Sequence, residues 1–550
     1  MVYYETSMTL ATIPYANVPR TTALHLDYVD RFDRVARFYG GSPDDLLSYQ
    51  RVAAGIRSEL SHRRKLVEIL IEQNQRFGCT AETEQSIRSL EKEDTFAVLT
   101  GQQVGLFSGP VFTLYKALTT VHLARRLTEQ GVRCVPVFWL AAEDHDLEEV
   151  VRTAVLDKEG VLTPLEAPAE RPAPDSPVGT VRLGAGISGV LDQLQNLLPA
   201  GEARDHLMGD LRQCYAPGAT WSEAFGRLIA RLFGRFGVVL IDPLDARLHE
   251  LASGVYRLAI EQAPRLRERL HERSRALVDA GYHAQVHVGE DSTLLFLTVN
   301  GGRHPLRQRG EWFEADGAST FPAELERRIA ATPLDFTPSA LLRPVVQDSL
   351  LPTIACVPGP AELAYFAQCT AIYEEFGRPA PVLFPRAAFT LAERRLARLL
   401  EKYGATLEDV WQGENHLRRK LAAASLGTDA DGWPKRLERG EEDLRKLFED
   451  LRGSVERIDP TLLDSLTHTH EKIEFHLERL RGKVSRAALD RSEILRRHEE
   501  ELLRFLTPAG GLQERVVSGV YFVGRAGYGL LDALLGQIDE GLGRHCFAVY

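Results

Sequence analysis

The spacing of apolar positions changes along this chain and separates helical from sheet-forming regions. Residues 26–93 carry apolar side chains at roughly helical spacing. A short apolar run at 96–99 then closes in a glycine-rich turn, and a helix-periodic segment follows at 110–127. The next apolar run, 132–140, ends abruptly in acidic and imidazole side chains. Strand, loop, helix and strand in this order are typical of a parallel sheet with helical crossovers.

The middle of the chain is predicted to form segments inserted between strands of this sheet. Prolines between 164 and 177 indicate a loop that leads into an inserted segment. Strand-like runs resume at 236–241, 283–288 and 294–299. A glycine pair and further alternating residues follow the last run, which indicates an antiparallel insertion.

Two later apolar runs, 354–357 and 382–384, are predicted as further strands of the same sheet, separated by a helix over 361–376. Strands this far apart in sequence can share one sheet if the intervening segments are insertions. The spacing of apolar residues therefore predicts an α/β fold with a parallel-sheet core and inserted connecting segments.

The C-terminal region carries a narrow apolar stripe instead. Leucine, valine and isoleucine recur at intervals near three and four from Leu437 to Ile458, and again after Pro460 as far as Ile494. Polar residues fill most gaps, which is the pattern of a coiled coil, and the proline favours an antiparallel hairpin. Its second arm of about 45 residues would extend about 70 Å at 1.5 Å per residue. The alternative is a surface helix packed on the core.

Composition narrows the class of protein. The 550 residues are 44% hydrophobic and 26% charged with a net charge of −11, which gives no global attraction to nucleic acid or an anionic membrane. None of the six cysteines forms a CxxC pair, so neither a zinc motif nor a disulfide framework is indicated. No signal peptide or bilayer-spanning apolar stretch is apparent, so we predict a cytoplasmic protein.

The first candidate site is the glycine-rich segment 100–110, predicted to lie between a strand and a helix that has Pro110 in its first turn. Glycines let backbone amides approach an anion, and a helix N-terminus favours negative charge. The segment is neither a Walker loop nor GxGxxG. A plain strand-to-helix turn is the alternative, although two adjacent glutamines have no obvious packing purpose. The candidate binding residues are Gln102, Gln103, Gly105, Ser108 and Gly109.

The second candidate is the run Glu143, Asp144, His145 and Asp146, which directly follows a predicted strand. Ligands of parallel sheets bind beyond the carboxyl ends of the strands. These side chains could act as a general base, bind an ammonium group or hold Mg²⁺. The alternative is a helix N-cap with an acidic first turn, but four consecutive ionisable residues exceed what a cap needs.

The third candidate is the block 342–362, in which Arg343, Gln347 and Asp348 stand among apolar residues. Arg343 and Asp348 could form a buried pair or a substrate clamp, and a structural salt bridge is the alternative. Arg386 follows the last predicted strand and could reach a carboxylate or phosphate.

These blocks together resemble the bacillithiol biosynthesis cysteine-adding enzyme family, BshC. The likeness covers essentially the whole chain, and the order of its blocks is distinctive. The segments that carry it, besides the coiled coil, are 100–116, 136–146, 342–362, 381–386 and 508–515. Segments 160–220 and 405–435 carry little of it.

The resemblance implies a Rossmann-like core related to class I aminoacyl-tRNA synthetases, and a coiled coil that mediates homodimers. In that scheme the chain divides into N-terminal helices with the first half of the core (1–150), a connecting insertion with core strands (151–340), the second half of the core (341–390), the coiled-coil domain (391–506), and a segment returning to the core (507–550).

The implied reaction joins L-cysteine to glucosaminyl malate by an amide bond. Because a carboxylate is a poor acyl donor, activation by a nucleotide (ATP or ADP) with Mg²⁺ is chemically sensible. The glycine-rich loop matches the region of the synthetase HIGH motif, but neither HIGH nor KMSKS is present. The loop would bind phosphate or the acidic substrate, Asp144–Asp146 would orient and deprotonate the amine, and Arg343 or Arg386 would bind the malate carboxylates.

Two other functions compete with this one. A nucleotide-binding coiled-coil scaffold without catalytic activity would tolerate an inert acidic cluster. An RNA-binding relative of the synthetases is disfavoured by the overall acidity.

Overall fold

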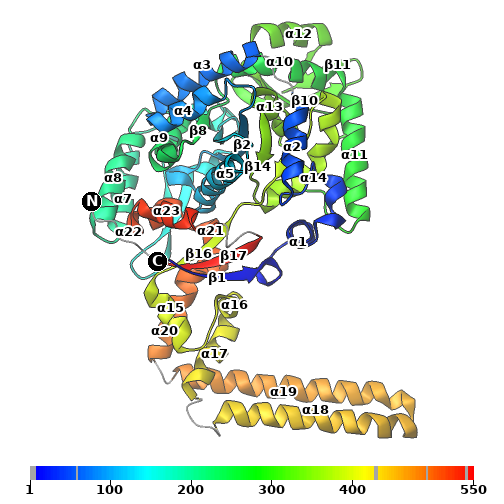
Figure 1. Cartoon of the computed structure of the whole chain (residues 1–550). Helices are drawn as coiled ribbons and strands as arrows, with labels where there is room; N and C mark the ends of the chain where they lie inside the picture. The colour runs from blue at the N-terminus through cyan, green and yellow to red at the C-terminus, as the bar shows by residue number, and fades with distance from the viewer. Residues whose placement is uncertain (1–7, 57–59, 427–431, 491–492, 539–542) are drawn as a thin grey trace.

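The computed structural model in Figure 1 describes residues 8–56, 60–426, 432–490, 493–538 and 543–550. At its centre is a five-stranded sheet of order β15-β14-β2-β3-β8, in which every neighbouring pair is parallel. The strands are β2 (Phe96–Gln103), β3 (Cys134–Ala141), β8 (Val239–Ile241), β14 (Thr353–Cys356) and β15 (Val382–Leu383). Chain order reverses between β2 and β14, as in doubly wound Rossmann-like folds. The predicted α/β core is confirmed.

Both faces of this sheet are buried, which explains its continuous apolar strands. In β3, Val135, Val137 and Trp139 join one hydrophobic cluster, while Phe138 and Leu140 join the other. One face packs on α5 (Phe112–Glu129) and α9 (Trp221–Phe233). The helices on the opposite face are α3 (Leu60–Phe77), α10 (Ala246–Glu261), α11 (Ala263–Asp279), α13 (Arg343–Leu350) and α14 (Pro360–Tyr373).

The insertions form smaller units on this core. The predicted antiparallel insertion is confirmed as a sheet of order β12-β11-β10-β9-β13. Its strands are β9 (Ser292–Val299), β10 (Gly302–Arg309), β11 (Trp312–Ala315), β12 (Ala318–Thr320) and β13 (Phe336–Pro338). The segment expected as a proline loop starts inside a strand, because β5 (Leu162–Glu166) pairs with β4 (Arg152–Leu156).

Two local predictions were wrong. The strand expected at 283–288 is irregular, because the side chain of Gln368 takes the place of a neighbouring strand. Its amide nitrogen donates to the carbonyl oxygen of Val286 at 2.9 Å, and its oxygen accepts from the Val286 amide at 2.8 Å. The helix expected to contain Pro110 begins at Phe112, and Pro110 instead forms a β-bridge with Ser518.

The remaining helices surround these sheets. They are α1 (Ala23–Asp30), α2 (Leu46–Gly55), α4 (Ala81–Ser89), α6 (Leu147–Val151), α7 (Ile187–Leu197), α8 (Glu202–Cys214), α12 (Pro322–Ala331), α21 (Gln513–Val516), α22 (Gly519–Ala526) and α23 (Gly529–Leu535). The helices between the core and the hairpin are α15 (Arg394–Lys402), α16 (Leu407–Trp411), α17 (Glu414–Leu426) and α20 (Glu493–Leu506).

A third sheet, absent from the sequence prediction, joins the two ends of the chain. Strand β17 (Arg544–Val549) lies between β1 (Thr9–Pro14), to which it is antiparallel, and β16 (Ala388–Ala392), to which it is parallel. β16 follows the last strand of the central sheet closely, so this small sheet fixes both ends of the chain to the edge of the core (Figure 1).

A buried ion pair completes this connection. Arg386 donates to both carboxylate oxygens of Glu514, at 2.9 and 2.5 Å, and the two side chains are only 5% and 4% exposed. Burial disfavours the charged form of both groups, but the attraction of the opposite charge is stronger than this effect. The pKa of Arg386 is therefore raised and that of Glu514 is lowered. Next to the pair, Gln513 accepts from the amide of Leu391 and donates to its carbonyl oxygen.

The predicted antiparallel helical hairpin is confirmed, with shorter arms. α18 (Trp433–Ile458) and α19 (Leu463–Asp490) project from the body side by side (Figure 1). Arg481 pairs with Glu441, and the rings of Phe448 and His470 lie 4.6 Å apart. The 28 residues of α19 extend about 42 Å rather than about 70 Å. In Figure 1, α20 runs back toward the body at an angle to α19, so the arm does not continue through residue 494.

The ion pair between Arg386 and Glu514 gives a stability prediction. Glu514→Gln should lower the free energy of unfolding by about 3–5 kcal/mol, because it leaves the buried guanidinium without a countercharge. Chemical denaturation of the full chain measures this. The control is Glu166→Gln, which breaks an exposed pair with Arg152 and should cost less than about 1 kcal/mol. Equal effects of the two substitutions would contradict the structural role of Glu514.

Candidate active site

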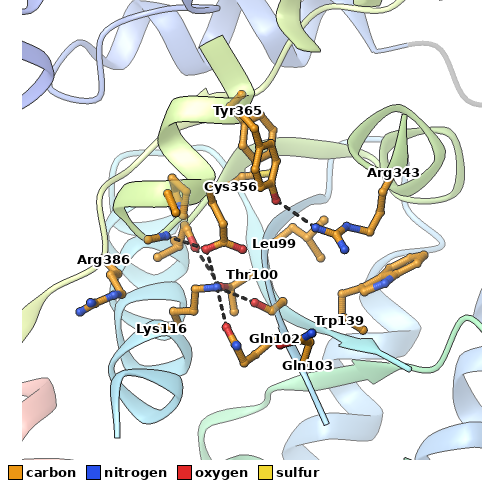
Figure 2. Close-up of a pocket in the computed structure, with 18 of the residues that line it drawn as sticks. Leu99, Thr100, Gln102, Gln103, Lys116, Trp139, Arg343, Cys356, Tyr365 and Arg386 are labelled. Atoms are coloured by element: carbon orange, nitrogen blue, oxygen red, sulfur yellow. Dashed lines mark hydrogen bonds and ion pairs between the residues drawn. The ribbon is translucent and has the colours of Figure 1, made fainter. Parts of the chain in front are cut away.

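A chamber of about 390 Å³ lies at the carboxyl ends of β2, β3 and β14, where strand order reverses. The end of β2, residues 99–103, forms one wall, and the turn from β14 into α14, residues 356–362, forms another. Polar side chains from both walls and from α5 and α13 converge in it (Figure 2). This is the place where open parallel sheets bind ligands.

Lys116, on α5, is held inside the chamber wall. Its side chain is 2% exposed, and its ammonium donates to Gly101 O at 2.7 Å and Gln102 Oε1 at 3.1 Å. The third partner is the Glu362 carboxylate, at 2.5 Å, which also accepts from the amide of Gly359. Burial lowers the pKa of Lys116, and Glu362 opposes this. The lysine therefore fixes the end of β2 against the start of α14.

Arg343 supplies a positive charge that the protein does not neutralise. Figure 2 shows its guanidinium meeting the hydroxyl of Tyr365, to which it donates at 3.0 Å. Within the described part of the chain, no carboxylate forms an ion pair with it. The guanidinium is therefore available to an anionic ligand in the chamber.

Arg343 and Asp348 do not form the ion pair that was one of the possibilities considered from the sequence. Five residues on a helix turn through about 140°, so the two side chains leave α13 in different directions. Asp348 accepts from Tyr373 Oη at 2.6 Å and is buried away from the chamber. Burial raises the pKa of Asp348 to about 7, opposed by Tyr373, Thr353 and Arg378.

Asp144 lies in the chamber at the end of β3. Its Oδ2 accepts from Gln103 Nε2 at 3.1 Å, and its Oδ1 lies 3.9 Å from the Arg303 guanidinium. Burial would raise the pKa of Asp144, but Arg303 and the hydrogen bonds lower it overall, so the carboxylate is ionised near neutral pH. Arg303 reaches this point from β10 and stacks on Phe296 with its guanidinium 3.7 Å from the ring centroid.

The other members of the acidic run do not line the chamber. His145 is half-buried, and its Nδ1 accepts from Arg303 at 3.3 Å and lies 3.6 Å from Asp144. Asp146 is exposed and stands at the N-cap of α6 without a side-chain cap bond. Glu143 is buried 3.5 Å from His249, and burial raises its pKa. Only Asp144 of the four meets the chamber.

The glycine-rich segment is divided by the structure. Gln102 and Gln103 belong to β2 and face the chamber, whereas Gly105, Ser108 and Gly109 lie outside it. Three consecutive residues, from Phe107 to Gly109, have positive φ angles of 49°, 75° and 63°, which makes a sharp turn.

This turn is buried against the C-terminal segment. Tyr215 Oη accepts from the Phe107 amide at 3.0 Å, and Ser518 Oγ donates to the Phe107 carbonyl oxygen at 2.8 Å. The Gly519 amide donates to Gly109 O at 3.1 Å. The turn thus has a packing function, and its backbone groups face the protein rather than the chamber.

The remaining predicted residues, Gln347 and Arg386, both line the chamber, although Arg386 is neutralised by Glu514. Five residues in or beside the chamber were not predicted from the sequence: Lys116, Glu362, Tyr365, Arg303 and Arg515. Lys116 had a readable signal, since it is a lone lysine among the apolar positions of a helix-periodic segment. Arg303 had none, because its contact with β3 depends on how the antiparallel sheet docks.

The described residues contain no group of three or more histidine, cysteine, aspartate or glutamate side chains placed to hold a metal ion. None of their helices combines the length and apolar character needed to cross a bilayer.

Comparison with known proteins adds independent information. Two family descriptions match the chain: "Bacillithiol biosynthesis BshC, N-terminal Rossmann-like domain" over residues 8–387, and "Bacillithiol biosynthesis BshC, C-terminal coiled-coil domain" over 389–547. Relatives named "Putative cysteine ligase BshC" from Koribacter versatilis and Solibacter usitatus are each 36% identical over 95% of this chain and 96% of their own length. One from Salinibacter ruber is 35% identical over 93% of each chain.

The buried carboxyl of Asp348 gives a prediction of pH dependence. Its pKa is higher in the folded chain than in the unfolded one, so the stability it contributes is present below about pH 4 and is lost as the pH rises to about 7. The Asp348→Asn variant has no carboxyl at this position and should not lose stability in this way. The free energy of unfolding of the variant minus that of the unchanged protein should therefore be larger at pH 8 than at pH 4.5, by on the order of a few kcal/mol.

Thermal or urea unfolding at the two pH values measures this difference. The exposed Asp443, on the helical hairpin, provides the control, since Asp443→Asn removes no buried carboxyl. If the Asp348→Asn difference were the same at both pH values, the carboxyl would not be titrating in the folded chain as described.

Proposed function

The chain belongs to the BshC family, and on that premise we propose that it joins L-cysteine to glucosaminyl malate by an amide bond in bacillithiol biosynthesis. The relatives' names support ligation of cysteine. The second substrate is inferred from the resemblance described above and from the charges of the chamber.

The observation that carries the proposal is an uncompensated cation beside an ionised carboxylate in one chamber. Arg343, with Tyr365, is suited to the carboxylates of a malate group. Asp144, kept ionised by Arg303 and Gln103, is suited to an amino group. Glucosaminyl malate carries both an amine and carboxylates, so one substrate satisfies both groups.

Amide formation requires the amine to attack the carboxyl carbon of cysteine and to lose a proton. Asp144 would accept a hydrogen bond from the amine, direct its lone pair toward that carbon and take up the proton that the amine loses. The oxygen displaced from the cysteine carboxyl would leave with the phosphate of the activating nucleotide. His145 contacts both Asp144 and Arg303 and would set the position of the carboxylate. A direct catalytic role for His145 or Asp146 stays a prediction, as does substrate binding by Gln347.

Nucleotide activation is part of the proposal. An amine displaces oxygen from a free carboxylate slowly, because that oxygen is a poor leaving group. ATP with Mg²⁺ would convert it into a better leaving group. The buried turn with Gly105, Ser108 and Gly109 does not fit a phosphate. Arg515 lines the chamber and is exposed, and among the described residues no carboxylate pairs with it, so it is free to bind an anion.

The competing function is a nucleotide-binding scaffold without catalysis. Such a protein has no need for a cation without an ion-pair partner and an ionised carboxylate that face the same chamber. The cytoplasm is the proposed location; the six cysteines are free thiols, as is usual in a reducing compartment.

Self-association through the helical hairpin is also proposed. Several apolar side chains on α18 and α19 are exposed in the single chain, among them Leu447 at 52% and Phe475 at 64%. A second copy of the hairpin is a partner with matching apolar positions.

The function is tested in a strain that lacks this gene. It should lose bacillithiol and accumulate glucosaminyl malate, and a plasmid copy should restore the thiol. A copy with Asp144→Asn should restore about 1% or less, because removing a positioned acid–base group typically costs 10²–10⁴-fold. The control is Glu148→Gln, an exposed carboxylate in the first turn of α6. Normal bacillithiol in the deletion strain, with no second copy present, would refute the function.

Light scattering tests the hairpin. The full chain should have twice the 61.4 kDa of one copy at micromolar concentration. Leu447→Glu combined with Leu451→Glu should return it to a single copy, because charge is placed in an apolar contact. The control is Phe321→Glu, an exposed apolar residue on the body. A full chain that has the mass of one copy would end the proposal.

A further inference from the structure

A second, smaller cavity of about 150 Å³ adjoins the main chamber; we call it the side chamber. Five residues line both cavities and so form a shared wall: Pro358, Pro360, Ala361, Arg386 and Arg515. The opposite wall comes from the N-terminal segment 15–25, and the floor from the C-terminal segment 512–515. The side chamber therefore exists only where both ends of the chain meet the core.

His25 is the unusual residue of this side chamber. It lies in the first turn of α1, is 3% exposed, and packs edge-on against Tyr15 with ring centroids 4.6 Å apart. Neither ring nitrogen has a hydrogen-bond partner among the described residues. Because an unpaired buried polar group opposes folding, such a residue points to a ligand that completes its hydrogen bonds.

Charge in the side chamber is divided between its walls. Burial and the nearby Arg386 lower the pKa of His25 to about 4, so at pH 7 its ring is neutral, with one donor and one acceptor nitrogen. Glu514 stays ionised through its pair with Arg386. Arg515 has no carboxylate partner in the described part of the chain. The Arg386–Glu514 pair, the cations of Arg20 and Arg515 and a neutral imidazole thus face one small cavity.

The rest of the lining is partly apolar and partly polar, and the volume of the cavity sets a size limit. The polar part comes from Arg20, Thr21, Thr22, His283, Gln285 and His545. Val18, Ala364 and Leu512 contribute apolar surface, together with the prolines of the shared wall. A volume of about 150 Å³ is well below that of the main chamber and leaves room for only a few non-hydrogen atoms beyond a carboxylate and an amine.

We propose that the side chamber is the subsite for a free α-amino acid with a short side chain, bound as a zwitterion through Arg515, Glu514 and His25. The carboxylate binds Arg515, the ammonium group lies between Glu514 and the acceptor nitrogen of His25, and the side chain packs on the apolar wall. The identity of the amino acid, L-cysteine, rests on the proposed function.

This placement gives the shared wall a function. Arg515 lines both cavities, so the carboxylate that it holds is directed toward the main chamber, where Asp144 and Arg343 would hold the amine-bearing substrate. Two cavities of unequal size that share a wall with Arg515 in it match a reaction that joins a large substrate to a small one.

Calorimetric titration of the full-length protein tests the assignment, with reduced L-cysteine and L-malate as separate probes. His25→Phe keeps the ring and breaks no hydrogen bond of the free protein, so its melting temperature should be unchanged or higher. It should weaken L-cysteine binding by about tenfold or more, the usual effect of losing a buried hydrogen bond to a ligand, and leave L-malate binding unchanged. Arg343→Gln is the matched control and should show the opposite selectivity.

Two outcomes would overturn the subsite. One is L-cysteine binding that His25→Phe leaves unchanged or that Arg343→Gln weakens equally; the other is no L-cysteine binding at millimolar concentration by a protein that binds L-malate. Either leaves the proposed function intact, because that is judged by thiol content in the deletion strain. Normal bacillithiol in that strain, together with L-cysteine binding that His25→Phe weakens, would refute the proposed function and support the subsite.

Discussion

The buried contact between Arg386 and Glu514 is the constraint on which both cavities depend. It joins the residue that follows the central sheet to a segment 128 positions later, and the two side chains neutralise each other away from water. Because a lone buried charge is far more costly than a pair, the C-terminal segment has one favourable position against the core. Arg515, the Ser518 contact to the glycine-rich turn, and strand β17 all follow from that position.

The sequence predicted the parallel sheet, the antiparallel insertion and the helical hairpin because each has a local period that side-chain burial imposes. It failed where a contact between distant segments replaces a local pattern, as when Gln368 satisfies the backbone at Val286. The glycine-rich turn has the composition of an anion-binding loop, but its contacts with Tyr215 and Ser518 lie 108 and 411 positions away. No window of sequence contains that information.

In the candidate site, too, local sequence patterns were predictive and contacts between distant segments were not. Asp144 and Arg343 were identifiable because ionisable residues at strand ends and in apolar blocks are unusual. The sequence does not show which charged side chains have an ion-pair partner in the folded chain. Arg386 is paired with Glu514 and Arg343 has no carboxylate partner among the described residues, although both arginines stand in similar apolar sequence. Lys116 and Glu362 form the clearest case, since their contact holds two strand ends together and leaves little charge for a ligand.

The position of β17 between β1 and β16 has a consequence for biogenesis. β1 leaves the ribosome long before its hydrogen-bonding partner, which is made about 530 residues later. At the usual 5–20 residues per second, the N-terminal strand waits for roughly half a minute to two minutes. Its open edge during that time is a template for wrong pairing. The small sheet, and with it the wall that carries Tyr15 and His25, therefore closes only after β17 has been made, and until then β1 needs protection from wrong pairing.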